Sequence, residues 1–184
     1  MPVLNFLSYF VPFVGESESE GMVLRCRRAD LSVKQDADNM LRLLDVYAND
    51  PMGIGESLPS SVMASLVAEM LNLGPSCVVY LAFIDGQPDA IALANAFVGF
   101  STFKAKRLLN IHDFVVVPEY RGLKVGQKLI DFIAADCQAR GFCKLTLEVL
   151  SGNKTAMGCY ERSGFVPYVL QEEAGHALLM QRFL

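Results

Sequence analysis

The sequence predicts one mixed α/β domain, in which helices flank a mostly antiparallel sheet. Three observations lead to this prediction. Strand-like runs alternate with stretches of helical periodicity, two long apolar runs flank a short Asp-Gly turn, and residues 108–150 show a strand, a helix and a strand in succession. The last arrangement is what a parallel crossover requires. The fold class is therefore α/β in the α+β sense, with one parallel strand pair.

Length and composition set the first limits on function. The chain has 184 residues, 52% of them hydrophobic, which suits a single domain with a substantial core. A net charge of -4 argues against nucleic-acid binding, because that needs clustered Lys and Arg side chains. Five cysteines without C-x-x-C spacing predict no disulfide framework and no metal site, and they fit a reducing cytoplasm. No apolar run is long enough to span a membrane, so no membrane partner is expected.

Residues 1–21 are predicted to form an apolar extension and an acidic linker ahead of a domain over residues 22–184. A signal peptide is rejected, because no Lys or Arg precedes the apolar run and no small-residue cleavage site follows it. Either the extension packs on the core or on a partner subunit, or it is a non-essential product of an upstream start codon.

The first half of the domain is predicted to hold three strands and two helices. The strands cover residues 23–27, 77–84 and 90–100, and the helices cover residues 36–48 and 60–73. Pro51 ends the first helix, whereas Ser60 or Ser61 caps the second. The strands on either side of residues 85–89 form an antiparallel hairpin.

The second half of the domain is predicted to hold four strands and two helices. Strands are predicted over residues 108–117, 144–150, 165–170 and 177–183, and helices over residues 125–140 and 153–163. Apolar residues recur at helical spacing from Val125 to Cys137, and Gly141 stops that helix. The last two strands are expected to pair as a terminal hairpin.

The turn over residues 118–126 is the first candidate site. It connects a strand to the start of a helix, where unpaired backbone N–H groups and the helix dipole favour an anion. Arg121, Lys124 and Lys128 add positive charge. The turn matches neither G-x-G-x-x-G nor the Walker pattern, so hydride transfer and nucleotide hydrolysis lose support. An ordinary turn with solvated lysines is the alternative.

Two segments, VVVPEYRGLKVGQKL and LTLEVLSGNKTAMGCYERSGF, resemble the GCN5-related N-acetyltransferase (GNAT) family. The first resembles its pyrophosphate-binding signature, and the second matches its Asn-x-x-Ala-x-x-x-Tyr-x-x-x-Gly-Phe element in full. The matching residues of that element are Asn153, Ala156, Tyr160, Gly164 and Phe165. The resemblance implies an acetyl-CoA-dependent transferase fold in which the two parallel strands splay apart.

The resemblance also implies which residues bind coenzyme A. The pantetheine arm would pair with the backbone of Phe114, Val115, Val116 and Val117, and an N–H near Val115 would polarise the thioester carbonyl. The pyrophosphate would lie on Arg121, Gly122, Leu123, Lys124, Val125, Gly126 and Gln127, with Asn153 and Ala156 nearby. Lys124 stands where the family usually has glycine, a residue that tolerates unusual backbone angles.

His112 is the expected general base, because an imidazole accepts protons near neutral pH, and Asp113 is the reserve candidate. Strand alternation predicts that the two cannot both face the cleft. A structural histidine is the alternative for His112. Tyr160 is expected to return a proton to the departing thiolate. No cysteine is placed to form an acyl-enzyme, so the amine is expected to attack directly in a ternary complex.

The predicted function is acetyl transfer to a primary amine of a small molecule, such as a polyamine, an amino acid or an aminoglycoside-like compound. Substrate determinants are expected in the early helices and in the loop from Tyr47 to Leu58. Asp45, Asp50 and Glu56 could attract a cationic acceptor, although surface acids are more often just solvated. Two alternatives stay open: a protein lysine or α-amine acetyltransferase, and a non-catalytic acyl-CoA-binding module. By analogy with the resembled family, a homodimer is expected.

Overall fold

The computed structural model describes residues 22–169, 173 and 177–183. The predicted N-terminal extension and linker over residues 1–21 lie outside the described residues. Among the helices that are described, none combines the length and the apolar character needed to cross a bilayer.

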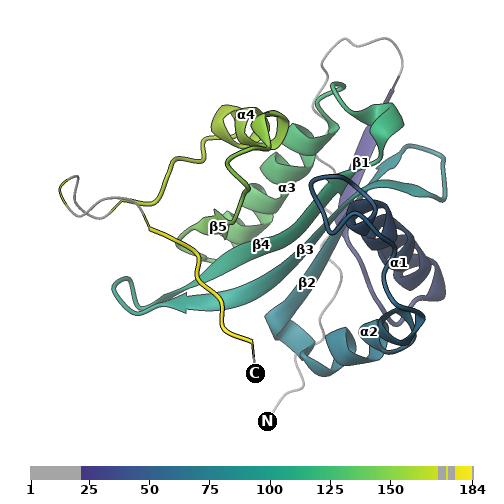
Figure 1. Ribbon diagram of the computed structural model, residues 1–184, viewed down its shortest axis with the longest axis horizontal. Coiled ribbons are helices and arrows are strands. Elements are labelled where there is room, and N and C mark those ends of the chain that lie inside the picture. The colour runs from purple at the N-terminus through teal and green to yellow at the C-terminus, as the bar shows by residue number, and fades with distance from the viewer. Residues whose placement is uncertain (1–21, 170–172, 174–176, 184) are drawn as a thin grey trace.

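Within the described residues, five strands form one sheet in the order β1-β2-β3-β4-β5 (Figure 1). They are β1 (Leu24–Arg28), β2 (Cys77–Ile84), β3 (Ala90–Ser101), β4 (Lys106–Val116) and β5 (Leu145–Leu147). The first four pair antiparallel, and β4 pairs parallel with β5. This sheet confirms the predicted fold class.

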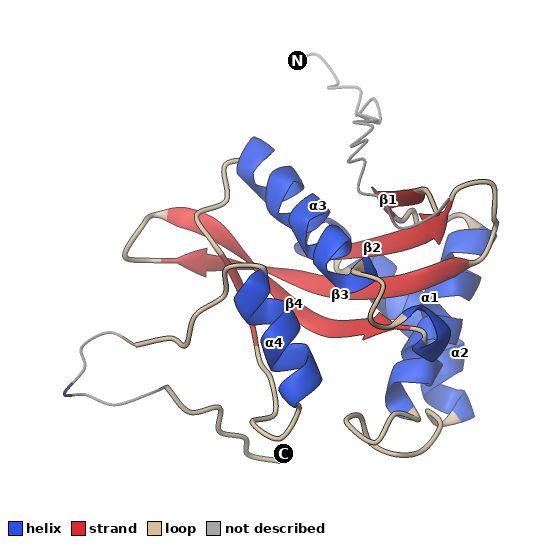
Figure 2. Cartoon of the chain, turned by 90° about the horizontal axis from the view of Figure 1, so that it is seen from above, coloured by secondary structure: helices blue, strands red, loops and turns tan. Residues whose placement is uncertain are grey.

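Four α-helices cover the two faces of the sheet (Figure 2). They are α1 (Lys34–Ala48), α2 (Ser60–Asn72), α3 (Val125–Ala139) and α4 (Lys154–Arg162). Helices α1 and α2 lie against one face, and α3 lies against the other. Helix α4 packs on α3, where Cys159 lies close to Gly126, and its Tyr160 packs on Phe114 of β4. Pro59, and not Ser60 or Ser61, is the residue before α2, and it forms no side-chain cap.

Each face of the sheet carries its own core. On the α3 face, Tyr80 and Ile111 pack with Leu129 and Ile133. On the α1 face, Leu81 and Leu93 pack with Met40 and Leu43. This separation follows from strand alternation, which sends neighbouring residues of β2 and β3 to opposite faces.

The predicted terminal hairpin is wrong for the residues that the structure describes. Residues 165–169 and 177–183 contain no strand, and β5 is three residues long. Phe165 packs on the core beside Tyr160, whereas Leu178 and Phe183 are more than four-fifths exposed. Local alternation predicted these strands, but a strand also needs a partner edge, which local sequence cannot supply.

Candidate active site

An irregularity in β4 brings the two candidate bases together. Ala96 lies opposite Ile111 and Asn95 lies opposite Asp113, so His112 has no partner on β3. A β-bulge of this kind interrupts the alternation of side chains. His112 and Asp113 therefore line the same cavity, and the expectation that they cannot both face it is wrong.

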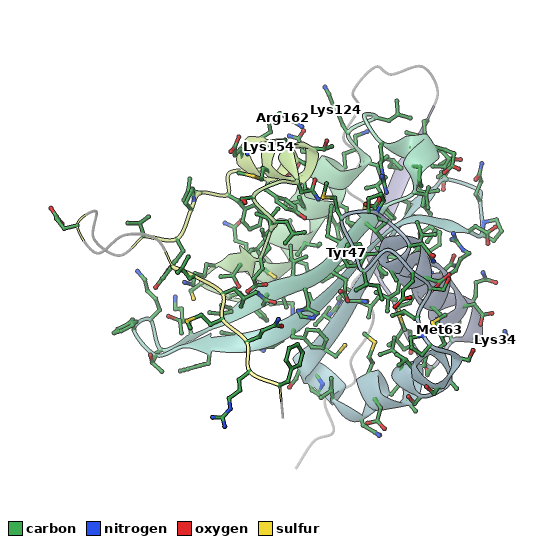
Figure 3. The ribbon with its side chains drawn as sticks, viewed as in Figure 1. Lys34, Tyr47, Met63, Lys124, Lys154 and Arg162 are labelled. Atoms are coloured by element: carbon green, nitrogen blue, oxygen red, sulfur yellow. The ribbon has the colours of Figure 1, made fainter. Side chains whose placement is uncertain are left out.

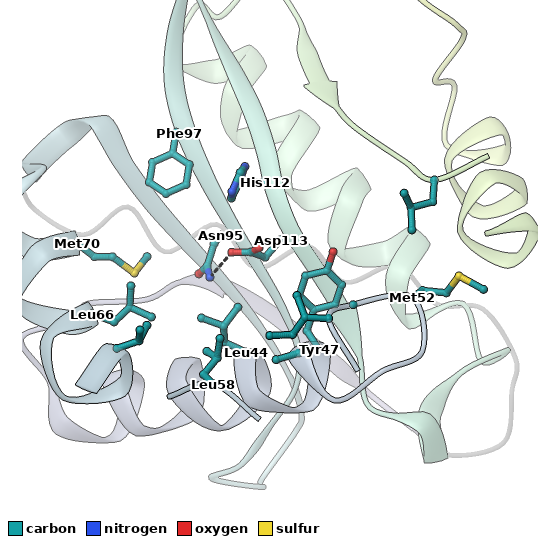
Figure 4. A pocket seen from close by; sticks show the side chains of 15 residues that line it. Leu44, Tyr47, Met52, Leu58, Leu66, Met70, Asn95, Phe97, His112 and Asp113 are labelled. Carbon is teal, nitrogen blue, oxygen red and sulfur yellow. Dashed lines mark hydrogen bonds between the residues drawn. The ribbon is translucent and has the colours of Figure 1, made fainter. Parts of the chain in front are cut away.

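The cavity has a volume of about 560 Å³ and lies between β3, β4, α1, α2 and the loop that joins the two helices (Figure 4). Most of its wall is apolar. The apolar lining consists of Leu44, Ala48, Met52, Ile54, Leu58, Val62, Leu66, Met70, Phe97 and Leu150. Such a volume suits a small molecule.

Four polar side chains line this cavity: Asn95, His112 and Asp113 from the sheet, and Tyr47 from α1 (Figure 4). The Asn95 amide Nδ2 donates to Asp113 Oδ2 at 3.0 Å. Its carbonyl Oδ1 is buried and has no partner among the described residues. The His112 ring meets Phe97 edge to face, with 5.6 Å between ring centroids.

Tyr47 comes from α1 and faces the same carboxylate. Burial raises the pKa of its phenol, and the negative charges of Asp113 and Asp50 raise it further. The hydroxyl therefore stays protonated near neutral pH and is a hydrogen-bond donor in the cavity.

β4 also presents an open edge. Its parallel pairing with β5 stops at Ile111 opposite Leu147, so residues 112–116 have no partner strand on that side within the described chain. This confirms the predicted splaying of the parallel pair. The gap it leaves is flanked by β4 and by the segment that leads from β5 to α4.

Backbone direction distinguishes the residues along this edge. Val117 N–H donates to Ile91 O at 3.0 Å, so the peptide groups of Val117 and Val115 point to β3. Those of Phe114 and Val116 then face the opening. Of the four residues predicted to pair with pantetheine, Phe114 and Val116 can do so, and Val115 does not offer its N–H to that side.

The predicted anion-binding turn leads into α3. Gly122 has φ 81° and Lys124 has φ 59° and ψ 12°, a left-handed pair of positions around the helix start. Lys124 precedes α3 without a side-chain cap, so the first N–H groups of the helix, on Val125, Gly126 and Gln127, have no partner within it. These groups and the helix dipole suit a phosphate.

At two positions of this turn, Lys124 and Gly126, the structure shows why a glycine is favoured. Lys124 adopts the left-handed backbone that the family's usual glycine tolerates, at a steric cost of about 1 kcal/mol. Gly126 is needed for close packing, because an added Cβ would lie 3.3 Å from Phe114 Cε1 and 3.5 Å from Cys159 Sγ. The glycine therefore lets α3 approach both β4 and α4.

The Arg121 side chain is directed away from the start of α3. Its Nη2 donates to Asp50 Oδ2 at 2.8 Å, and its Nε donates to Val116 O at 2.9 Å. Asp50 also accepts a bond from Met52 N–H, which together with Arg121 lowers the pKa of its carboxyl. This ion pair ties the loop after α1 to the anion-binding turn.

Asp45 is also held by protein groups, since it accepts a bond from Leu58 N–H at 3.2 Å. Glu56 is exposed. None of the three acids proposed to attract an acceptor lines the cavity.

Tyr160 lies on α4 and is 9% exposed. Its ring packs edge to face with Phe114 on the open edge of β4, with 6.0 Å between centroids. Burial raises the pKa of its phenol, so the hydroxyl keeps its proton through the neutral range. Asn153 caps the same helix, because its Oδ1 accepts from Ala156 N–H at 3.1 Å.

Two further features surround this helix. Figure 3 shows Lys124, Lys154 and Arg162 on the same side of the ribbon, near the start of α3 and along α4. Cys159 packs against Gly126, and burial raises the pKa of its thiol, which therefore stays protonated.

Sequence reasoning expected substrate determinants in the early helices and in the loop from Tyr47 to Leu58, and the cavity wall lies there. It missed Asn95. Asn95 carried a usable signal, because it is the one polar residue in the apolar run of β3 from Ala90 to Gly99. A lone amide in a buried strand needs partners, and a site is one place to find them.

The Acetyltransferase (GNAT) family model matches residues 42–165. The chain therefore belongs to this family of acetyltransferases. A thialysine N-epsilon-acetyltransferase of Bos taurus is 34% identical over 77 residues, which cover 42% of this chain and 45% of that protein. The match thus spans less than half the length of that relative.

Solved structures share the fold. An aminoglycoside acetyltransferase from an uncultured soil metagenomic sample superposes with a TM-score of 0.66 at 16% identity, over 88% of this chain and 95% of that one. Glucosamine-6-phosphate N-acetyltransferase from Arabidopsis thaliana gives a TM-score of 0.60 at 17% identity, over 88% and 98%. At these identities the likeness shows the fold alone.

Proposed function

We propose that this protein transfers an acetyl group from acetyl-CoA to a primary amine of a small molecule by direct attack. The observation that carries this proposal is the position of the β4 bulge. At residues 112–114 the cavity that contains His112 and Asp113 meets the open strand edge, which leads to the predicted anion-binding turn. An amine and an acyl donor would meet there.

The residues present fit coenzyme A. The unpaired N–H groups at the start of α3, the positive φ of Gly122 and Lys124, and the basic side chains nearby suit a pyrophosphate. The peptide groups of Phe114 and the N–H of Val116 face the open edge and suit the pantetheine arm, whereas Val116 O already accepts from Arg121 Nε. Bound there, acetyl-CoA would supply the acyl group as a thioester.

His112 would act as the base. An amine with a pKa near 10.4 arrives as an ammonium, and it must lose a proton before its nitrogen can form the N–C bond. His112 lines the cavity and is exposed, so it can accept that proton and pass it to solvent. Asp113, on the same wall, is the alternative acceptor.

Tyr160 would act as the acid. As the N–C bond forms and the C–S bond breaks, the leaving sulfur takes the Tyr160 hydroxyl proton and becomes a thiol. The second amine proton goes to solvent, and the Tyr160 phenolate takes a proton back from solvent, so that one proton is released for each amide formed. The phenol is protonated at neutral pH and packs on Phe114, beside the open edge. The protonated Cys159 thiol is packed against Gly126, which supports direct attack over an acyl-enzyme.

A small-molecule acceptor is preferred over a protein because the cavity, of about 560 Å³, has the size of a small-molecule site and its described lining is mostly apolar, with Asp113 as the one carboxylate. An open acidic groove would have favoured a peptide. A reducing cytoplasm and a homodimer remain predictions; the five cysteines, present as free thiols, support the former.

The test is thiol release from acetyl-CoA by the full chain across primary amines, with coenzyme A binding measured by calorimetry. Turnover is expected, and Tyr160→Phe should lower kcat about 100-fold with little change in coenzyme A affinity. Coenzyme A binding without turnover on any amine would instead support the non-catalytic acyl-CoA-binding module.

A further inference from the structure

We infer, on the basis of the proposed function, that the acceptor is a primary amine with one positive charge and an apolar body. Its ammonium would lie between the Asp113 carboxylate and Asn95 Oδ1, and its body would lie along α1 and α2. This narrows the acceptor class and disfavours polyamines, aminoglycosides and free amino acids.

Asn95 supplies the first argument. Its side chain is 1% exposed, yet Oδ1 has no hydrogen-bond partner among the described residues. The orientation of the amide follows from Asp113, because turning the amide over would place two oxygens against each other. The open position is therefore an acceptor, and a donor from a ligand would satisfy it.

Asp113 supplies the second argument. Asp36 pairs with Arg27 and Asp50 pairs with Arg121, whereas Asp113 forms no ion pair within the described part of the chain. A carboxylate next to an open amide oxygen offers two acceptors to one ligand group. An ammonium carries three donors and the complementary charge.

The walls supply the third argument. Beyond the four polar groups near the bulge, the cavity is lined by apolar side chains from α1, the loop and α2. Asp113 is the only carboxylate among its described lining residues, and no Lys or Arg lines it. A second ammonium, or the carboxylate of an amino acid, would find no partner there, and burying an unpaired charge is strongly unfavourable.

The acceptor's nitrogen would also be correctly placed for reaction. Asp113 and His112 directly precede Phe114, whose peptide group faces the open edge of β4. An ammonium anchored on Asp113 is thus beside both the proposed base and the proposed thioester site. The residue proposed to bind the ammonium and the residue proposed to accept its proton are therefore neighbours at the same β-bulge.

The experiment compares acceptors of matched length with the full chain at one pH: hexylamine, 1,6-diaminohexane and 6-aminohexanoate, with 2-phenylethylamine as a bulkier monoamine. We expect kcat/KM for hexylamine to exceed that for the other two six-carbon acceptors about 100-fold, since each would bury an unpaired charge. A diamine used equally well would overturn this inference and leave acetyl transfer intact. Silence with every amine, with coenzyme A still bound, would overturn the proposed function itself.

A charge introduced into the wall gives a second test. Ile54 lines the cavity but is 64% exposed, so Ile54→Glu should fold. We expect it to shift the preference at least about 10-fold toward 1,6-diaminohexane by supplying a second carboxylate. Leu71→Glu is the matched control, because Leu71 is a 46% exposed residue of α2 that does not line the cavity. An unchanged preference in Ile54→Glu would contradict the inference.

Discussion

Two asparagines on the α1 side of the sheet, Asn39 and Asn95, are each 1% exposed, but they are bonded very differently. Asn39 Oδ1 accepts from Ala90 N–H at 2.8 Å and from Arg42 at 3.0 Å, and Nδ2 donates to Pro88 O at 3.2 Å. Asn95 Nδ2 donates to Asp113, whereas its Oδ1 has no partner among the residues that the structure describes. The first amide holds α1 on the sheet, and the second faces a cavity.

Two carboxylates show the same difference. Asp36 accepts two bonds from Arg27, at 2.7 and 2.6 Å, and one from Asp30 N–H at 2.8 Å. Burial alone would raise the pKa of Asp36, but these bonds outweigh it and the pKa is lowered. Asp113 accepts from Asn95 and has no ion-pair partner in the described chain. The side chains of Asn39 and Asp36 thus have a partner at each polar atom, whereas Asn95 and Asp113 leave positions for a ligand.

The largest expected effect is the difference between replacing Asp113, at the site, and replacing Asp36, in the structural ion pair. Asp113→Asn should lower kcat/KM about 100-fold, because the ammonium loses a charge-assisted bond, while the melting temperature changes little. Asp36→Asn should lower the free energy of unfolding by about 3 kcal/mol, because the buried end of an ion pair is removed. Steady-state kinetics measures kcat/KM, and urea unfolding measures the free energy of unfolding, for both variants. Equal loss of stability in both variants would remove the distinction.

The next largest effect is expected from replacing each of the two asparagines, which should change the free energy of unfolding by different amounts. Asn39→Leu should cost about 2 kcal/mol of folding free energy, because the buried Ala90 N–H loses its partner. Asn95→Leu should cost less than about 1 kcal/mol, because an already unpaired acceptor is removed along with the bond to Asp113. It should nevertheless raise KM for the amine. Urea midpoints of both variants test this, and a larger loss in Asn95→Leu would contradict it.

A smaller effect is expected at the ion pair between the site loop and the anion-binding turn. Arg121 is 42% exposed at its side chain, so its bridge to Asp50 is partly in solvent. Asp50→Asn keeps an oxygen for Met52 N–H and should cost about 0.5 kcal/mol, several times less than Asp36→Asn. Denaturant unfolding at low and high salt checks this, since the difference from wild type should shrink as salt screens the pair.

The smallest effect concerns Tyr47. Burial and the charges of Asp113 and Asp50 raise the pKa of its phenol, because a nearby negative charge disfavours the phenolate. Removing that charge in Asp113→Asn should lower this pKa, so Tyr47 should ionise at a lower pH than in the wild type. Ultraviolet titration of tyrosinate, with Tyr47→Phe to assign the signal, measures the shift. Asp36→Asn is the control and should leave it unchanged.

Much of the fold could be predicted from sequence because its signals are local. Helical spacing from Val125 to Cys137 correctly predicted the face that α3 buries, and Gly141 does end that helix region with φ 74°. The long hairpin of β2 and β3 was predicted from two apolar runs and a short turn. The terminal hairpin failed because exposed apolar alternation specifies a strand only where a partner edge is available.

The candidate site likewise contains features that local sequence predicts and features that depend on how the strands pair. The anion-binding turn and Tyr160 were identified from contiguous motifs, since a strand, a turn and a helix start follow one another along the chain. The bulge at His112 was not, because it depends on how β3 pairs with β4. Alternation within one strand therefore predicted the wrong geometry for His112 and Asp113.

By itself, the sequence predicted the order of the elements from the first strand to α4, and it singled out the turn before α3, Tyr160, His112 and Asp113 as candidate site residues. Tertiary structure alone decided that Tyr47, Asn95 and Asp113 share a cavity, and that one amide oxygen there is left open. The physical reason is that folding decides which groups surround a buried donor or acceptor, and therefore whether that group has a hydrogen-bond partner. Residues far apart along the chain must be packed before a missing partner can be recognised.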